Sequence, residues 1–382
     1  MSDQLALGLR DVAALGQIFT PEPVVRAMLA LRRNSGRVLE PSCGDGAFLR
    51  HLPGAVGLEL DPDHCPPGAQ AIDFFAYPER EQFDTIIGNP PYVRFQDIPP
   101  ATQALIARGR YGACLDKRAN LYLFFSDKCL RHLKPGGELI FITPRDFLKL
   151  SGAVRLNRWL LEQGSFTDVI ELGDARVFDA AVPNCLIWRF ECDARTRTLR
   201  YAEVSGGATA ARLAAELAAP RWQTRHQVEA AGHLMFTRGD FPLRLSELAF
   251  VKVGAVSGAD AIYADEVAGT RDFVCSSTVL DGRTRRMIWC EADAPAPAAL
   301  LPHRVRLQAR RIRQFDDSNW WQWGRGYYQS ERPRIYVNGK TRAAQPFFIH
   351  PCPHYDGAVL AVFPHREKVN LAALCAALNA KA

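Results

Sequence analysis

The stretch from Phe83 to Phe95, FDTIIGNPPYVRF, decides the fold because it joins a buried strand to an abrupt stop. Residues 84–89 form a short apolar run, which is typical of a strand covered on both faces of a parallel sheet. Pro90 and Pro91 follow directly, and proline has no N–H to offer a neighbouring strand. The sequence therefore predicts a buried strand that ends on an Asn-Pro-Pro-Tyr corner.

Strand and helix patterns alternate on both sides of this corner, over the first 190 residues. A helical repeat of apolar residues from Leu121 to Leu133 predicts a helix that Pro135-Gly136-Gly137 closes. This alternation predicts a doubly wound, Rossmann-like α/β sheet. The predicted strands are RVLEP (37–41), AVGLELD (55–61), DTIIGN (84–89), ELIFIT (138–143), DVIEL (168–172) and NCLIWRF (184–190).

The chain is long for a single domain, at 382 residues. Its composition shifts near GGATAARLAAELAAP (206–220), which reads as a helix or a linker. Beyond that point the pattern changes to short strands with turns, as in FVKVGAVSG (250–258) and RPRIYVNGK (332–340). We therefore predict a first domain over 1–215, a linker over 216–240 and a mainly β second domain over 241–382.

The overall composition indicates a soluble cytoplasmic protein. The N-terminus lacks the layout of a signal peptide, and no apolar run approaches a membrane span. Ten cysteines are scattered without a C-x-x-C pair, which favours reduced thiols. His350, Cys352 and His354 could suggest a metal site, but no matching second ligand pair occurs elsewhere, so we expect no metal.

A basic segment lies in the second predicted domain. Residues 301–350 contain ten Arg and Lys against three Asp and Glu, a net +7 within a chain of net +6. Cations with interleaved aromatics suit a nucleic-acid surface, since cations neutralise phosphates and aromatics stack on bases. The alternative is a solvated arginine-rich face over a small β core. The aromatics are Trp320, Trp321, Trp323, Tyr327 and Tyr328. The candidate nucleic-acid-binding cations are Arg304, Arg306, Arg310, Arg311, Arg313, Arg325, Arg332, Arg334 and Lys340.

A nucleoside site is predicted along the carboxyl edge of the sheet. LEPSCGDGAFL (39–49) reads as strand, Gly-x-Gly turn and helix, and Gly44 allows close backbone approach. Glu59 ends the next strand, where a carboxylate can accept from both ribose hydroxyls. Asp73 can accept from an exocyclic amine with Phe74 against the ring. Each carboxylate alone reads as a surface residue, but their positions at successive strand ends favour a site.

The Asn-Pro-Pro-Tyr corner suits an amine on a planar base. The amide oxygen of Asn89 and the carbonyl of Pro90 are two acceptors, and the proline rings hold them rigidly. Tyr92 offers a flat face on which a heterocycle can stack. The alternative is a strand terminator with a capping Asn and a core Tyr.

Together these motifs resemble the amino-DNA methyltransferases, particularly the adenine-N6 enzymes of TaqI-like arrangement. The resemblance covers the first 190 residues motif by motif and the remainder only in layout. It begins with GQIFTPEPVVRAML (16–29), continues through the motifs above, and ends with ARVFDAAVPN (175–184). The family pattern implies a class I methyltransferase sheet over 1–215 and a C-terminal target-recognition domain over 241–382.

The resemblance also implies ligands and site residues. The cofactor is S-adenosylmethionine, with S-adenosylhomocysteine as product and no metal. The target base is held by Asn89, Pro90 and Tyr92, with Phe178 packing on it. Cofactor-binding positions are matched by Thr20, Glu40, Pro41, Gly44, Glu59, Asp73, Phe74 and Pro91.

The function implied is methylation of the N6 amine of an adenine flipped out of duplex DNA, as the modification part of a restriction–modification system. A separately encoded endonuclease is then a partner, and a monomer suffices because one flipped base needs one site. Adenine in RNA, cytosine N4 in DNA and a protein glutamine remain alternative targets. A different class of protein, an inactive DNA-binding specificity module, is the further alternative.

Overall fold

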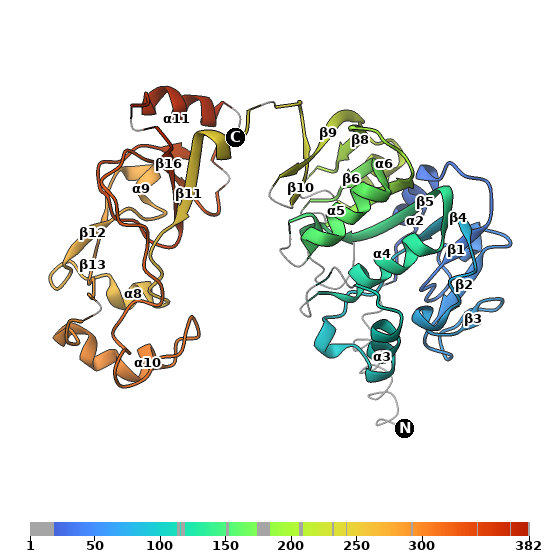
Figure 1. Ribbon diagram of the computed structural model, residues 1–382, viewed down its shortest axis with the longest axis horizontal. Helices are drawn as coiled ribbons and strands as arrows, with labels where there is room; N and C mark the ends of the chain where they lie inside the picture. The colour runs from blue at the N-terminus through green and yellow to red at the C-terminus, as the bar shows by residue number, and fades with distance from the viewer. Residues whose placement is uncertain are drawn as a thin grey trace. The chain divides into compact units, whose positions relative to one another are not determined.

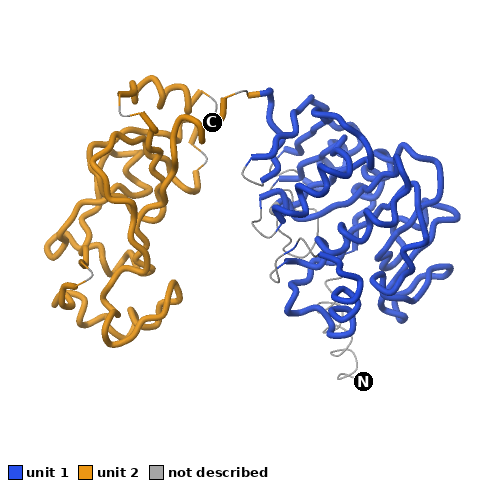
Figure 2. The backbone as a smooth tube through the Cα atoms, in the orientation of Figure 1, with its two compact units in different colours: residues 1–240 blue, residues 241–382 orange. Residues whose placement is uncertain are grey.

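The computed structural model describes residues 19–112, 115, 119–149, 153–173, 184–205, 209–230, 233–241, 243–291, 293–341, 343–366 and 368–380. The chain divides into two compact units, Met1–Asp240 and Phe241–Ala382, which Figure 2 distinguishes by colour. Each unit has a hydrophobic core of its own.

The first unit is built on a ten-stranded sheet in the described residues, with the order β10-β9-β8-β6-β7-β5-β4-β1-β2-β3 (Figure 1). Strands from β3 to β5 pair in parallel, and β7 runs antiparallel between β5 and β6. β8 is parallel to β6, and β9 and β10 extend this side in antiparallel pairs. The strands are β1 Val38–Glu40, β2 Val56–Glu59, β3 Gln70–Ala71, β4 Phe83–Gly88, β5 Leu133–Pro144, β6 Gly164–Glu171, β7 Cys185–Cys192, β8 Thr198–Glu203, β9 Gln223–Ala230 and β10 His233–Thr237.

Helices cover both faces of this sheet, because neighbouring residues of the central strands are buried in different cores. Ile86 of β4 and Phe141 of β5 belong to one cluster, with residues of α3, α4 and α5. Ile87 and Ile140 belong to a second cluster, with residues of α2 and α6. Successive side chains of a strand point to opposite faces, so both faces are apolar. The predicted doubly wound α/β class is confirmed. The helices are α2 Glu22–Leu31, α3 Pro100–Arg108, α4 Leu121–Arg131, α5 Val154–Gln163 and α6 Ala210–Ala218.

The end of α4 differs from the sequence prediction. The helix ends at Arg131, and Leu133 already pairs with Phe83 of β4 as the first residue of β5. The next pair joins Thr85 to Glu138, so residues 134–137 bulge out of the β4–β5 pairing. Pro135-Gly136-Gly137 therefore lies within β5 as an irregularity and does not close the helix. A bulge accommodates proline, which cannot donate to a sheet.

The region predicted as a linker, 216–240, contains regular structure. Residues 210–218 form α6, and residues 223–230 and 233–237 are strands β9 and β10 of the first sheet. The division between the units falls instead after Asp240. The sequence of β9, QTRHQVEA, did not predict a strand. The segment lies near the sheet edge, where half-buried polar side chains give no apolar pattern.

The second unit contains two small antiparallel sheets and short helices. One sheet has the order β11-β16-β14-β15, and the other pairs β12 with β13. The predicted strands within 250–258 and 332–340 correspond to β11 and β14. The strands are β11 Ala249–Val253, β12 Arg271–Phe273, β13 Arg285–Met287, β14 Ile335–Asn338, β15 Phe347–Phe348 and β16 Val359–Pro364. The helices are α7 Leu245–Leu248, α8 Asp260–Tyr263, α9 Thr278–Asp281, α10 Arg304–Gln308 and α11 Leu371–Asn379.

Within the described ranges, no helix has both the length and the apolar character needed to cross a membrane.

Candidate active site

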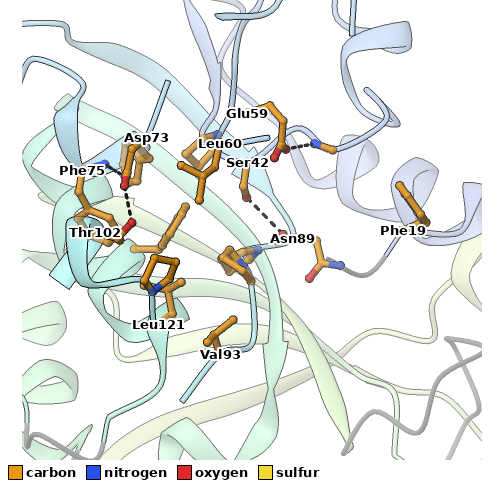
Figure 3. Close-up of a pocket in the computed structure, with 17 residues that line it drawn as sticks. Phe19, Ser42, Glu59, Leu60, Asp73, Phe75, Asn89, Val93, Thr102 and Leu121 are labelled. Carbon is orange, nitrogen blue, oxygen red and sulfur yellow. Dashed lines mark hydrogen bonds between the residues drawn. The ribbon is translucent and has the colours of Figure 1, made fainter. Parts of the chain in front are cut away.

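A pocket opens at the carboxyl edge of the first sheet, where β1, β2, β3 and β4 end (Figure 3). The ends of parallel strands meet at one edge, which is where open α/β sheets bind their ligands. The pocket brings together eight residues predicted from the sequence, including both carboxylates at strand ends and the Asn-Pro-Pro corner. They are Pro41, Gly44, Glu59, Asp73, Phe74, Asn89, Pro90 and Pro91.

The Gly-x-Gly turn is tied directly to the carboxylate of β2. The backbone N–H of Gly44 donates to Glu59 Oε2 at 2.7 Å, and the N–H of Asp61 donates to Glu59 Oε1 at 3.0 Å. Gly44 has φ +51° and Gly46 has φ +79°, values that favour glycine. Glu59 is 5% exposed, so its two backbone bonds hold a buried carboxylate at the pocket wall.

Asp73 is held in place by two hydrogen bonds. Its Oδ1 accepts from the N–H of Phe75 at 2.8 Å, and its Oδ2 accepts from the hydroxyl of Thr102 on α3 at 2.6 Å (Figure 3). Phe74 beside it is buried and packs on Phe125 of α4, with ring centroids 5.0 Å apart. An acidic side chain of fixed orientation therefore stands next to an aromatic wall, as a planar heterocycle with an amine requires.

Glu40, the last residue of β1, is a buried acid that lacks a full set of partners. Its side chain is 2% exposed, and Oε2 has no hydrogen-bond partner among the described residues. Burial raises the pKa of this carboxyl well above its usual range, and the nearby carboxylates of Asp45 and Glu59 raise it further. Buried polar atoms are nearly always hydrogen-bonded, so Oε2 is suited to accept from a bound cation.

The Asn89 corner is connected to the segment that precedes α2. Asn89 Nδ2 donates to the hydroxyl of Thr20 at 3.2 Å, and the Asn89 carbonyl accepts from the hydroxyl of Ser42 at 3.4 Å. A planar amide that turns its nitrogen to Thr20 presents its oxygen on the opposite side, as Figure 3 shows. Pro90 and Pro91 line the pocket next to it. The corner is therefore anchored on both its side chain and its backbone.

Tyr92 is half-buried, and its hydroxyl is fixed. The hydroxyl donates to the carbonyl of Ile142 in β5 at 2.9 Å. The ring contacts the ring of Tyr122 edge-on, with ring centroids 5.9 Å apart. Burial raises the pKa of the Tyr92 hydroxyl well above its usual range, so the group stays protonated. Tyr92 thus has a fixed ring orientation. The predicted aromatic Phe178 lies outside the described residues.

Several lining residues were not predicted from the sequence. Phe19, which is 52% exposed, and Leu60 contribute apolar wall, and Thr102 orients Asp73. Phe19 and Leu60 adjoin Thr20 and Glu59, so adjacency to a motif could have indicated them. Thr102 sits on α3 with no local signal, because its contact with Asp73 spans 29 residues.

The structure corrects two of the candidate DNA-binding cations. Arg310 is 9% exposed and donates to the carbonyls of Leu307, Trp320 and Gln322, among others. Arg334 is 7% exposed and donates to the carbonyls of Arg332, Pro353 and Ser330. Both guanidinium groups connect irregular loops, whose carbonyls have no strand partner, so these side chains are not available to phosphates.

The remaining candidates differ in exposure. Arg332 is half-buried and donates to the carbonyls of Pro364 and His365. Arg304 is exposed but already pairs with Asp317 at 2.7 Å. The exposed candidates are Arg304, Arg306, Arg311, Arg313, Arg325 and Lys340.

The tryptophan-rich stretch is core and not a stacking surface. Trp320 and Trp323 are 3% and 5% exposed, and the Nε1 of Trp321 donates to the Ala294 carbonyl. The Trp323 ring stacks on Phe273 with centroids 5.2 Å apart. The strands of this unit are short, and large aromatics form much of the cluster that makes up its core. Of the five aromatics, Tyr328 remains exposed, at 38%.

His350, Cys352 and His354 do not converge. His350 contacts the Gly282 carbonyl, Cys352 contacts the Asp272 carbonyl, and His354 is hydrogen-bonded to Tyr327. In the part of the chain that the structure describes, no group of three His, Cys, Asp or Glu side chains is placed to hold a metal ion.

Comparison with known proteins relates the first unit to the methylases of restriction–modification systems. Residues 67–178 match the Eco57I restriction-modification methylase family. The Type II methyltransferase M.TthHB8I of Thermus thermophilus is 36% identical over 195 residues, 46% of this chain and 45% of that protein. M.HincII of Haemophilus influenzae is 31% identical over 186 residues, 46% of this chain and 37% of that protein. The match therefore spans less than half the length of these relatives.

One solved structure shares the fold over nearly the whole chain. The Type IIL restriction-modification enzyme MmeI, solved in complex with DNA, matches with a TM-score of 0.55 and 12% identity. The match covers 96% of this chain and 60% of that chain. The resemblance to the DNA methyltransferases of restriction–modification systems, first indicated by the motifs, is therefore confirmed.

Proposed function

We propose that this protein is a site-specific DNA methyltransferase. It transfers a methyl group from S-adenosylmethionine to the N6 amine of an adenine flipped out of duplex DNA, with S-adenosylhomocysteine as the leaving group and one N6 proton released to solvent. It is the modification component of a restriction–modification system, with a separate endonuclease as its partner, and it acts in the cytoplasm as a monomer. The observation that carries the proposal is the Asn89-Pro90-Pro91 corner, which lines the same pocket as Glu59 and Asp73.

The residues that line the pocket, with Glu40 beside them at the end of β1, fit S-adenosylmethionine. Buried Glu40 Oε2, which has no partner among the described residues, is suited to the ammonium of the methionine part. Glu59 holds the ribose hydroxyls, and Asp73 accepts from the adenine amine beside Phe74. Pro41, Gly44 and Pro91 complete the lining. Thr20 is assigned to the methionine part of the cofactor. When bound, the cofactor supplies an electrophilic methyl group on a sulfonium.

The corner residues act on the target amine. The Asn89 oxygen and the Pro90 carbonyl accept from the two N–H bonds of N6, which directs its lone pair away from the ring and towards the methyl group. Tyr92 stacks on the base, and Phe178 is proposed as the second stacking ring. Stacking is worth about 1–3 kcal/mol per base, which offsets part of the cost of flipping. Fixed acceptors and fixed geometry carry the step.

The second unit is proposed as the target-recognition domain. The six predicted cations that are exposed are the candidates for phosphate contacts, namely Arg304, Arg306, Arg311, Arg313, Arg325 and Lys340. If all six contact phosphates, log affinity falls with log salt at a slope of about −5. MmeI, which was solved with DNA, supports this assignment, because the fold similarity extends over both units.

The test is methyl transfer from labelled S-adenosylmethionine to duplex DNA, single-stranded DNA and RNA, followed by digestion and identification of nucleosides by mass. Asn89→Ala is compared with the wild type and with Gln96→Ala, an exposed amide that does not line the pocket. We expect N6-methyladenine in duplex DNA, lost in Asn89→Ala and retained in Gln96→Ala.

Other outcomes separate the alternatives. Label found only in RNA would identify an RNA adenine as the target. Formation of 4-methylcytosine would identify N4 of cytosine in DNA as the target. DNA binding without any transfer identifies an inactive specificity module and overturns the catalytic proposal.

A further inference from the structure

A second groove on the first unit lies outside the proposed active site. It is formed where β6 and β8 end and β9 begins, and its volume is about 350 Å³, within the range of ligand pockets. Three arginines and two glutamates line it, which gives a net charge of +1. They are Arg145, Glu171, Glu203, Arg225 and Arg238.

Both glutamates are already occupied by cations from the groove itself. Arg145 pairs with Glu171 at 2.6 Å, and Arg225 pairs with Glu203 at 3.1 Å. The hydroxyl of Tyr201 also donates to Glu171. Arg238 is exposed, and no ion pair of its guanidinium occurs with the described residues. The acids are therefore neutralised within the groove, and one positive charge is left for an outside ligand.

Arg225 adds a buried hydrogen-bond donor, which indicates a site for an anionic ligand. Its side chain is 6% exposed, its guanidinium lies 4.9 Å from the centroid of the Tyr201 ring, and its Nε has no partner among the described residues. Leaving a buried donor of a charged group without an acceptor is costly. An oxyanion in the groove would accept charge-assisted hydrogen bonds from Arg225 Nε and from Arg238, which both line it.

The groove and the Asn89 corner share one edge of the sheet. Asn89 follows the carboxyl end of β4, and Arg225 lies near the start of β9, five positions further along the sheet order β4-β5-β7-β6-β8-β9. Five strand spacings amount to about 24 Å. Phosphates of one DNA strand repeat about every 3.4 Å along the helix axis, so a duplex at the corner has a backbone phosphate about seven base pairs away within reach of the groove.

We propose that this groove is a phosphate clamp, in which Arg225 and Arg238 bind one backbone phosphate of the DNA whose base enters at Asn89. The proposal rests on the proposed function. The clamp belongs to the first unit. It positions the target strand independently of the cations of the second unit.

The test uses the full-length protein with Arg238→Ala, an exposed site whose substitution leaves the fold intact. The control is Arg26→Ala on α2, an exposed cation paired with Glu22 at 2.7 Å and outside the groove. We expect Arg238→Ala to make the slope of log affinity against log salt shallower by about 0.9 and to weaken duplex binding about fivefold at 0.15 M salt. KM for S-adenosylmethionine stays at the wild-type value.

A second measurement locates the phosphate. Single neutral methylphosphonates are placed along the target strand of the duplex. One position weakens wild-type binding and has no effect on Arg238→Ala, because the variant has already lost that contact. Arg225→Lys, which keeps the charge and loses Nε, shows the same insensitivity, and its melting temperature reports whether it is folded.

The outcomes distinguish the two proposals. A wild type that neither binds nor methylates DNA overturns both. A wild type that methylates DNA, with an unchanged salt slope and the same methylphosphonate profile in Arg238→Ala, overturns the clamp alone.

Discussion

The amide nitrogen of Asn89 donates a hydrogen bond to the hydroxyl of Thr20, with 3.2 Å between the two atoms. Thr20 precedes α2, and Asn89 follows β4, so 69 residues of chain separate the partners. The resemblance implied that Thr20 contacts the cofactor. The hydrogen bond adds a second role, since it sets the direction in which the Asn89 oxygen points. Thr20 is therefore a positioning residue for the proposed acceptor.

Thr20→Val is expected to lower kcat by about 2- to 10-fold, because a neutral hydrogen bond is worth about 0.5–1.5 kcal/mol. Thr20→Ser keeps the hydroxyl and retains activity. Steady-state kinetics with varied S-adenosylmethionine separates the two roles of the residue. A raised KM for the cofactor with unchanged kcat would mean that Thr20 serves the cofactor and does not orient Asn89.

Glu40→Gln is expected to weaken S-adenosylmethionine binding by about 10- to 100-fold, because a hydrogen bond between charged groups is worth about 1.5–3 kcal/mol. Burial raises the pKa of Glu40, and the ammonium ligand binds the ionised form. Wild-type affinity therefore rises with pH as this raised pKa is passed, while Glu40→Gln shows no such rise. Titration calorimetry at a series of pH values upward from 4.5, the ordinary pKa of a Glu carboxyl, measures both effects. Equal pH profiles for the two proteins would rule out Glu40 as the ammonium partner.

Thr102→Val removes the hydroxyl that donates to Asp73 Oδ2 at 2.6 Å and keeps the side-chain shape. Asp73 keeps its bond from the Phe75 N–H, so the carboxylate loses orientation and not its burial. KM for S-adenosylmethionine is expected to rise about 3- to 10-fold with kcat unchanged. Thr102→Ser is the matched control. A fall in kcat at unchanged KM would contradict a role on the cofactor side.

Arg310→Met and Arg306→Ala are expected to have different effects. Arg310 donates to several loop carbonyls, so its loss destabilises the second unit by about 2–4 kcal/mol and leaves the salt slope of DNA binding unchanged in folded protein. Arg306 is exposed, so Arg306→Ala leaves stability unchanged and makes the slope shallower by about 0.9. Thermal unfolding and salt-dependent binding measure these effects. The same salt-slope change in both variants would argue against a purely structural Arg310.

Asp356 makes the stability of the second unit depend on pH. Burial raises the pKa of Asp356 from 3.8 to about 6. The contribution of protonated Asp356 to the free energy of unfolding is therefore fully present below pH 4 and is lost as pH rises through 6. Asp356→Asn keeps the acceptor for the Ala358 N–H and has no charge to bury. The variant is expected to be more stable than the wild type by up to about 3 kcal/mol at pH 7.5, with no gain near pH 4.

Hydrogen exchange of peptides from β14 and β16, compared between the two proteins at equal pH, tests this expectation. Slower exchange in Asp356→Asn at both pH 4 and pH 7.5 would show that the gain in stability does not come from removing the ionisation of Asp356.

The cofactor side of the pocket could be predicted from sequence because strand ends are readable. Glu59 and Asp73 follow short apolar runs bounded by polar residues, and the carboxyl ends of parallel strands meet at one edge. The burial of Arg310 and Trp323 could not be predicted in the same way. In the second unit the strands are short and the loops irregular, so no periodicity separates a buried Trp from an exposed one. Thr102 remained hidden because its contact is made in space and not along the chain.

The unequal sequence separation of paired strands in the first sheet has a consequence for folding. Pairing β1 with β4 must close a chain of more than forty residues, whereas only two residues of sequence separate β9 from β10. Loop closure costs entropy that grows with length, so pairs close in sequence form first. We expect the β8–β9–β10 side to acquire protection early during refolding. The half of the sheet that carries Glu40 and Glu59 then assembles last, so cofactor binding is gained only at the end of folding.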